Sequence, residues 1–489
     1  MAVNRDRPDL TYRKTVEEHE SLITKLVKQP AFNREELLRE FDAHWRLLCH
    51  GGEGLRELYV AWDGAETENL LVKPGRESLK GKSRKTPIIL ATSLKTDQRA
   101  AELRKWTGWN ERLYGESAIG IRLKYINPAP TVAESLSTWY FNTVTPSALT
   151  CPNALGQLSQ RKSKEHWVVL SAEIPDGNTL FAVRWRSPAK GRLPMSEDDA
   201  LARRWEVVPY RVRSLSNASL VPRGGGSLDL GDKSVLLVGC GSVGSEVACS
   251  LTSAGVGKLT IADFDVMSEE NLYRHTLSLK HIGSLKSTAV AEELAQKHPW
   301  AEVRGWKDRL EAMRDASKLN GFDLVVIAIG SPTVERAFAE YCVDEGVEVA
   351  ILNCWLEGYG IGGHAILSLP NSLGCWYCAY TDPNTLKPGL SSNLNFLAEN
   401  QIFMRNHGGC GTQFLPFSGI EARQTAAMTA TLAVRFLSGE LGESSRVSWR
   451  GDGSAAKRAN LKTTYRHRHF NESLQVLPLR DENCGHCGN

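Results

Sequence analysis

One stretch, residues 234–269, limits the fold of this chain more than any other part of the sequence. Its first segment, residues 235–238, is short, continuous and apolar, which is typical of a strand buried on both faces of a parallel sheet. Three glycines follow this strand: Gly239, Gly241 and Gly244. Without Cβ atoms they allow a tight turn and a close approach of the backbone, with a helix beginning near Gly244. Residues 259–262 then have the composition of a second buried strand.

The order strand, glycine turn, helix and strand predicts a nucleotide-binding unit. Phosphate groups bind the free N–H groups at the start of a helix that follows such a turn. Asp263 ends the second strand about 20 residues after the glycines, where dinucleotide-binding folds hold a ribose hydroxyl. We therefore predict an α/β fold with a Rossmann-like, mostly parallel sheet. The alternative is a glycine turn that serves only tight packing.

The residues after this strand indicate which nucleotide is bound. The chain reads Asp263-x-Asp265, then Asn271-Leu-x-Arg274 and then Gly-x-x-Lys286. This order resembles the superfamily of ubiquitin-activating enzymes and their bacterial relatives, the ThiF-type and MoeB-type adenylyltransferases. The resemblance implies that Asp263 binds the ribose of ATP and that Asn271, Arg274 and Lys286 bind its phosphates. A carboxylate that attacks the α-phosphorus of ATP needs positive charge around the phosphates, which a nicotinamide site does not need.

The sequence departs from this family at one strand end. Residues 322–329 are predicted to form another buried strand whose end faces the nucleotide. The resemblance implies an Asp there that helps to hold Mg²⁺, but this chain has Ile329, Gly330 and Ser331. Either Asp265 holds the Mg²⁺, or catalysis is weakened.

Two Cys-x-x-Cys pairs predict a metal site. The four cysteines are Cys375, Cys378, Cys484 and Cys487. Two such pairs supply the four thiolates of a tetrahedral structural Zn²⁺ site, with redox chemistry as the alternative for either pair alone. The resemblance supports zinc, because the ThiF-type and MoeB-type relatives have one pair after the sheet and one near the C-terminus. Since a closed site leaves no position for water, its role is folding.

Cys410 is the candidate nucleophile. It lies between glycines in a stretch that precedes an alanine-rich segment, residues 422–437, which is predicted to be helical. The resemblance implies a crossover loop, residues 379–415, that passes over the active site and in some members carries a reactive cysteine at this place. A thiolate accepts an acyl group readily near neutral pH, and His407 or the cations of the nucleotide site could help to ionise it. The alternative is a buried apolar cysteine.

Composition sets the class of protein. A chain of 489 residues indicates two or three domains. A net charge of +3 does not argue for nucleic acid, and no apolar run approaches the roughly 18 residues of a membrane helix. The first residues lack the apolar core of a signal peptide, and the cysteine content suits a reducing compartment, so we expect a cytoplasmic protein.

Residues 1–222 are predicted to form a separate α+β accessory domain. Helical spacing covers residues 17–28 and 33–48, and strands are expected at 58–62 and 86–94, with a hairpin from 167–172 and 179–185. The resemblance leaves two interpretations open, an inactive adenylation-like domain or a conjugating-enzyme-like domain with Cys151 as its nucleophile. We favour a non-catalytic domain. A linker at 223–231 and an adenylation domain at 232–489 complete the predicted organisation.

The resemblance implies an enzyme that uses ATP to adenylate the C-terminal glycine of a ubiquitin-like protein and then forms a thioester on Cys410. It implies a bacterial conjugation pathway, which in some cases serves antiviral defence, with a conjugating-enzyme partner and a homodimer. The rivals are a sulfur-carrier adenylyltransferase of the thiamine or molybdopterin type, a non-catalytic scaffold, and a nicotinamide oxidoreductase. The cations at Arg274 and Lys286 and the cysteine pairs disfavour the last.

Overall fold

The structure is a computed structural model of the whole chain. It describes residues 6–51, 54–77, 87–93, 103, 116–131, 136–148, 161–370, 372–382, 385, 387, 389, 391–406, 413–482 and 484–487. The chain forms two compact units, Met1–Leu220 and Val221–Asn489. No helix among the described residues is long and apolar enough to cross a membrane.

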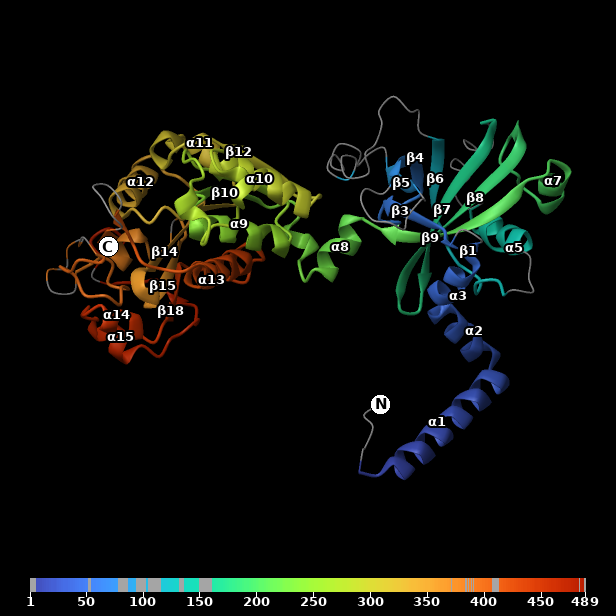
Figure 1. Cartoon of the computed structure of the whole chain (residues 1–489), viewed down its shortest axis with the longest axis horizontal. Coiled ribbons are helices and arrows are strands. Elements are labelled where there is room, and N and C mark those ends of the chain that lie inside the picture. The colour runs from blue at the N-terminus through green and yellow to red at the C-terminus, as the bar shows by residue number, and fades with distance from the viewer. Residues whose placement is uncertain are drawn as a thin grey trace. The chain divides into compact units, whose positions relative to one another are not determined.

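The C-terminal unit is built on one mixed sheet (Figure 1). Its strands are β10 (Ser234–Val238), β11 (Lys258–Ala262), β12 (Glu302–Trp306), β13 (Leu324–Ile327), β14 (Ala350–Glu357), β15 (Gly362–Ser368), β18 (Ser445–Arg450) and β19 (Leu477–Pro478). The spatial order is β12-β11-β10-β13-β14-β15-β18-β19, and the first five strands are parallel. The order reverses between β10 and β13, and ligands of open α/β sheets bind at such a switch point. The predicted Rossmann-like sheet is confirmed.

Helices cover both faces of this sheet. They are α9 (Ser242–Ala254), α10 (Lys286–Lys297), α11 (Ala316–Leu319), α12 (Pro332–Asp344) and α13 (Gly419–Leu437), with the short α14 (Ser454–Arg458) and α15 (Tyr465–His469) near the end of the chain. Alternate residues of β10 point to opposite faces, so Val235 and Leu237 pack with α9, α10 and α13, whereas Leu236 and Val238 pack with α12. A strand buried on both faces explains the continuous apolar run in the sequence.

The N-terminal unit contains a closed barrel in its described part. Its strands, in spatial order, are β3 (Glu57–Ala61), β5 (Pro87–Ser93), β4 (Glu68–Glu77), β6 (Glu116–Arg122), β7 (Ser163–Ile174), β8 (Gly177–Gly191) and β9 (Glu206–Ser214). The parallel pairing of β3 with β9 closes the barrel. The predicted hairpin is confirmed as β7 and β8, which pair antiparallel from Ser163 to Gly191.

The helices of this unit are α1 (Pro8–Lys28), α2 (Pro30–Arg39), α3 (Phe41–Leu48), α5 (Leu136–Ala148) and α7 (Glu197–Ala202), and α8 (Asn217–Arg223) follows β9. The helical spacing over residues 33–48 is confirmed except at Glu40, where the helix is broken: α2 ends at Arg39 and α3 begins at Phe41. The break allows Phe41 and Trp45 to be buried against Trp139 and Phe181. Tertiary packing has therefore overridden the continuous helical spacing.

The stretch 223–231, for which we predicted a linker, packs on the C-terminal unit. The N–H of Ser227 donates to the carbonyl of Ala254 at the end of α9. Leu230 is fully buried in the core of the same unit.

Candidate functional site

The glycine turn brings the start of α9 to the switch point of the sheet. Gly239 has φ +90°, and a Cβ there would lie 2.8 Å from the carbonyl oxygen of Ala328. A Cβ on Gly244 would overlap the carbonyl of Gly239, so this glycine lets the helix pack closely on the turn. Gly241 precedes α9 and faces open space, since a Cβ there would meet nothing within 4 Å. The turn therefore leaves room for a ligand beside the N–H groups of α9.

Asp263 ties the end of β11 to this turn. Its carboxylate accepts hydrogen bonds from the N–H of Cys240, at 2.5 Å, and from the N–H of Asp265, at 2.7 Å. It is buried, and each carboxylate oxygen can accept a further hydrogen bond. Ribose binding by Asp263 stays a prediction.

Lys286 begins α10 and is almost buried, with 7% of its surface exposed. Its Nζ lies 3.3 Å from Oδ2 of Asp265, whose side chain is about half exposed at 51%. The N–H of Lys286 also donates to the carbonyl of Asp265 at 2.9 Å. This pair presents one ammonium group and one accessible carboxylate directly after β11.

Asn271 and Arg274 lie on the turn that follows. The side-chain oxygen of Asn271 accepts from the N–H and the hydroxyl of Ser268, so it caps this short helical turn. The Nε of Arg274 is buried, and no residue in the described part of the chain accepts a hydrogen bond from it. Its guanidinium carbon lies 4.8 Å from the centre of the Phe417 ring. A buried donor without an acceptor fits an anionic ligand, because such a donor costs free energy when it stays unpaired.

A crevice of about 360 Å³ opens at the switch point. The glycine turn contributes Gly241 and Ser242, and the end of β13 contributes Ala328 to Gly330. Further lining residues that sequence analysis missed come from α12, from β14 and from segments after the first cysteine pair: Glu335, Trp355, Ser391, Ser392, Asn395, Leu415 and Phe417. The fold leads us to expect a ligand cavity at this place. Of the residues predicted to bind ATP, Gly241 lines it. The predicted ribose and phosphate residues are not among its lining residues: Asp263, Asp265, Asn271, Arg274 and Lys286.

Gly330, where the resemblance implies an acidic residue, lines this crevice, and Ser331 follows it in the chain. Gly330 has φ +64° and open space around it, and the N–H of Ser331 donates to Oε1 of Glu335 at 3.1 Å. Oε2 of Glu335 accepts from Nδ2 of Asn353 at 3.0 Å. The carboxyl group of Glu335 therefore joins the start of α12 to β14, and nothing in its sequence context indicated this.

Burial raises the pKa of Glu335 to about 7, although Asn353 and Ser331 donate to it. A raised pKa means that the folded state binds the proton more tightly than the unfolded state does. Stability from this group is therefore fully present below pH 4.5 and is lost as the pH rises through about 7. The difference from the ordinary pKa of 4.5 corresponds to about 3 kcal/mol, since each pH unit is worth about 1.4 kcal/mol.

We expect Glu335→Gln to remove this pH dependence. The amide keeps one acceptor for Ser331 and can donate to Asn353 once that side chain has turned. Relative to the original protein, the variant should gain about 3 kcal/mol of unfolding free energy between pH 4.5 and pH 8, measured in urea. Asp344→Asn, an exposed change at the end of the same helix, is the control. Equal pH profiles for Glu335→Gln and the original protein would contradict the assignment.

A buried network holds the segment 394–397 against the sheet. Glu357, the last residue of β14, accepts from the N–H of Phe396 at 2.6 Å and from the N–H of Leu397 at 2.8 Å. His364 on β15 lies 2.9 Å from the same carboxylate. Burial lowers the pKa of His364, so a neutral ring donates from Nε2 to Glu357 and accepts at Nδ1 from Ser448.

The C-terminal part of the chain completes this network. Nη1 of Arg466 on α15 donates to the carbonyl of Leu394 at 2.5 Å, and the N–H of Thr464 donates to the carbonyl of Phe396 at 2.8 Å. Trp355 then donates from Nε1 to the side chain of Asn395 at 3.0 Å. The network thereby places Asn395 in the wall of the crevice.

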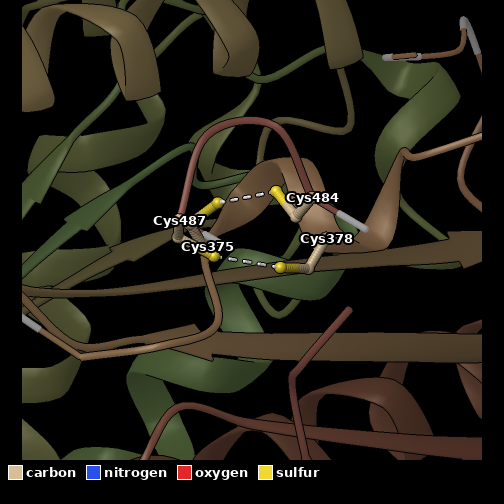
Figure 2. Close-up of side chains that lie close together, drawn as sticks. All are labelled: Cys375, Cys378, Cys484 and Cys487. Atoms are coloured by element: carbon tan, nitrogen blue, oxygen red, sulfur yellow. Dashed lines mark hydrogen bonds between the residues drawn. The ribbon is translucent and has the colours of Figure 1, made fainter. Parts of the chain in front are cut away.

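The four paired cysteines come together as one cluster (Figure 2). Their sulfur atoms all lie within 4.8 Å of one another, with Cys375 to Cys484 at 3.9 Å and Cys378 to Cys487 at 3.4 Å. In a tetrahedral site with Zn–S bonds of about 2.3 Å, neighbouring sulfurs are about 3.8 Å apart. None of the four forms a disulfide. The donor set and its spacing therefore fit Zn²⁺.

The thiols of this cluster act on one another. A hydrogen bond from Cys375 lowers the pKa of Cys378, and burial raises the pKa of Cys487. The turn that carries the first cysteine pair packs into an aromatic core made by Trp376, Tyr377 and Tyr380. Loss of the cluster would therefore disturb the wall beside the crevice, which Tyr380 also lines.

Cys410, His407 and Cys151 lie outside the described residues. The strands that flank residues 407–412 are β16 (Arg405–Asn406) and β17 (Gln413–Phe414), and they pair with each other. Leu415 and Phe417, directly after β17, line the crevice. Among the described cysteines, burial raises the pKa of Cys49 and of Cys354 to about 12, which does not suit a nucleophile.

Comparison with known proteins gives one family. Residues 215–486 match the ThiF family. The chain is 26% identical over 286 residues to the ATP-dependent ubiquitin transferase-like protein Cap2 of Pseudomonas aeruginosa, which covers 57% of this chain and 50% of that protein. It is 22% identical over 442 residues to Cap2 of Vibrio cholerae, which covers 82% and 71%. The chain thus spans about half the length of the first of these relatives.

Two further proteins are similar over shorter parts. The adenylyltransferase and sulfurtransferase UBA4 of Yarrowia lipolytica is 32% identical over 168 residues, which covers 34% of this chain and 41% of that protein. The crystal structure of E. coli MccB with ATP matches 53% of this chain and 68% of that chain, at 17% identity and a TM-score of 0.36.

Proposed function

Since the chain belongs to the ThiF family, we propose that it uses ATP to adenylate the C-terminal carboxylate of a small ubiquitin-like protein. The observation that carries this proposal is the crevice at the switch point, which joins the glycine turn to Leu415 and Phe417. A nucleotide bound at the glycine turn and a polypeptide tail bound beside Leu415 and Phe417 would meet in this one cavity. The relatives named ubiquitin transferase-like support a protein substrate.

In the proposed reaction a carboxylate oxygen of the tail attacks the α-phosphorus of ATP. The bond between the α-phosphorus and its bridging oxygen breaks, and pyrophosphate leaves. Arg274 and Lys286 would stabilise the charge that develops on the phosphates, because fixed cations that are at least partly buried act more strongly than cations in water. Asp263 orients the ribose, and the N–H groups of α9 hold phosphate oxygens.

Mg²⁺ would reduce the negative charge of the phosphates, and one or two carboxylates usually suffice to bind it beside them. Asp265 is our candidate, since its carboxylate is accessible next to Lys286. Among the described residues, the four cysteines are the only group of three or more His, Cys, Asp or Glu side chains that could hold a metal. Their Zn²⁺ would serve folding alone.

We further propose that Cys410 receives the acyl group. Its thiolate attacks the carbonyl carbon of the acyl adenylate, a thioester forms, and AMP leaves. A transfer within one protein is favoured because the two groups are already close, which is worth several kcal/mol of barrier. A conjugating enzyme would then take the acyl group, within a bacterial pathway that can serve antiviral defence, and the active species is a homodimer.

The test of this step is a covalent adduct. Incubation with ATP and the cognate ubiquitin-like protein should give an adduct on a non-reducing gel that reductant removes. We expect Cys410→Ala to abolish it, Cys410→Ser to give a reductant-resistant ester or no adduct, and Cys151→Ala to keep it. An adduct that survives Cys410→Ala and disappears with Cys151→Ala would show that Cys151, in the N-terminal unit, is the nucleophile that receives the acyl group.

A second candidate function is sulfur-carrier adenylation, favoured by the relative named adenylyltransferase and sulfurtransferase. In that case the same adenylate forms, and no thioester on Cys410 is needed. Pyrophosphate exchange in the absence of any adduct would support this function. ATP binding without exchange would support the scaffold.

A further inference from the structure

Arg274 has an unusual environment for a charged residue. No acidic side chain in the described part of the chain pairs with it, and its Nε is buried without an acceptor. The face of Phe417 lies 4.8 Å from the guanidinium carbon. An aromatic face attracts a cation but accepts none of its N–H bonds in the way a carboxylate would. The ring of Phe417 therefore stabilises the positive charge of Arg274 and leaves the N–H groups of the guanidinium available to bind an anion.

Phe417 is itself held from two sides. The N–H of Tyr359, just after β14, donates to the carbonyl of Pro416 at 2.6 Å. Gly358 lets Leu415 approach closely, since a Cβ on this glycine would lie 2.7 Å from the Leu415 side chain. Gly419 packs on the loop of Arg274, because a Cβ there would lie 3.2 Å from the carbonyl of Tyr273. The segment 413–419 is therefore docked between the end of β14 and the loop that carries Arg274.

We propose that Phe417 is a positioning residue that holds the Arg274 guanidinium for a polyphosphate group, so that anion affinity depends on the docking of the segment 413–419. This inference rests on the proposed function for the identity of the anion, the phosphates of ATP. It goes beyond that function because it links the phosphate site to the segment that directly follows Cys410. Removal of the aromatic face leaves Arg274 free to adopt other rotamers, and phosphate binding must then order it.

The test uses the whole chain and three probes: ATP, tripolyphosphate and adenosine. Phe417→Leu keeps the apolar volume and removes the ring. We expect it to weaken ATP and tripolyphosphate binding about tenfold and to leave adenosine binding within about twofold. Phe417→Tyr restores the face and should return both affinities to within about twofold of the original. Tyr341→Leu is the matched control, because Tyr341 on α12 places its ring 5.7 Å from the guanidinium carbon of Arg314; it should change none of the three affinities.

The outcomes separate this inference from the proposed function. A chain that binds neither ATP nor tripolyphosphate overturns both proposals. Normal ATP binding by Phe417→Leu overturns this inference alone. An equal loss for adenosine and tripolyphosphate, or a failure of Phe417→Tyr to restore binding, shows that the ring serves only packing and overturns it as well.

Discussion

Cys484→Ser should leave the protein without its zinc and lower the melting temperature of the C-terminal unit on the order of 10 °C. Cys484 is almost fully buried, and its sulfur lies 3.9 Å from that of Cys375. Structural zinc contributes on the order of ten kcal/mol in small metal-dependent folds, and part of this should be lost in a unit with a large core of its own. A loss of several kcal/mol of unfolding free energy lowers the melting temperature of a domain of this size by about 10 °C.

The measurement is zinc content by elemental analysis together with a melting curve. The original protein should contain one zinc per chain. Cys342→Ser is the matched control, since Cys342 is also a buried cysteine of this unit and lies outside the cluster. The free energy of ATP binding should change less than the free energy of unfolding does. The absence of zinc from the original protein, or full zinc content in Cys484→Ser, would contradict the predicted zinc site.

Local signals in the sequence were enough to predict the nucleotide-binding half of the C-terminal unit. The turn needs residues without a Cβ at Gly239 and Gly244. The three glycines at their fixed spacing can be recognised in the sequence alone. The four-cysteine cluster was predictable for a similar reason, because two Cys-x-x-Cys pairs have few other uses.

The rest of the crevice could not be predicted, because it depends on contacts between distant parts of the chain. Glu335 is an ordinary first-turn acidic residue of a helix until β14 brings Asn353 to it. Phe417 is one apolar residue among several in its segment, and only the fold places it under Arg274.

The barrel shows the same limit in the N-terminal unit. Individual strands could be predicted from composition, but closure depends on the pairing of Glu57 with Arg211. Residues so far apart in sequence carry no local signal of their pairing.

Arg274→Ala and Lys286→Met should each lower pyrophosphate exchange into ATP about a hundredfold or more. Removal of one group that stabilises the charge of a transition state has an effect of this size. Met keeps most of the buried stem of Lys286 and removes its charge, so that the effect is not one of unfolding. The measurement is exchange of labelled pyrophosphate at saturating concentrations of the small protein.

Arg423→Ala is the control for these two variants. Arg423 is a largely exposed arginine on α13 that pairs with Glu246 on α9. Its loss should change exchange by no more than about twofold and should leave melting unchanged. Equal effects of Arg423→Ala and Arg274→Ala would show that general charge, and not a phosphate site, governs the rate.

The central claim is that this chain activates a terminal carboxylate with ATP. Pyrophosphate exchange with the cognate ubiquitin-like protein tests this claim most directly. We predict exchange that requires the terminal glycine of that protein, continues in Cys410→Ala and falls about a hundredfold or more in Arg274→Ala. Formation of ADP in place of AMP and pyrophosphate, or exchange that does not need the terminal glycine, would contradict the claim.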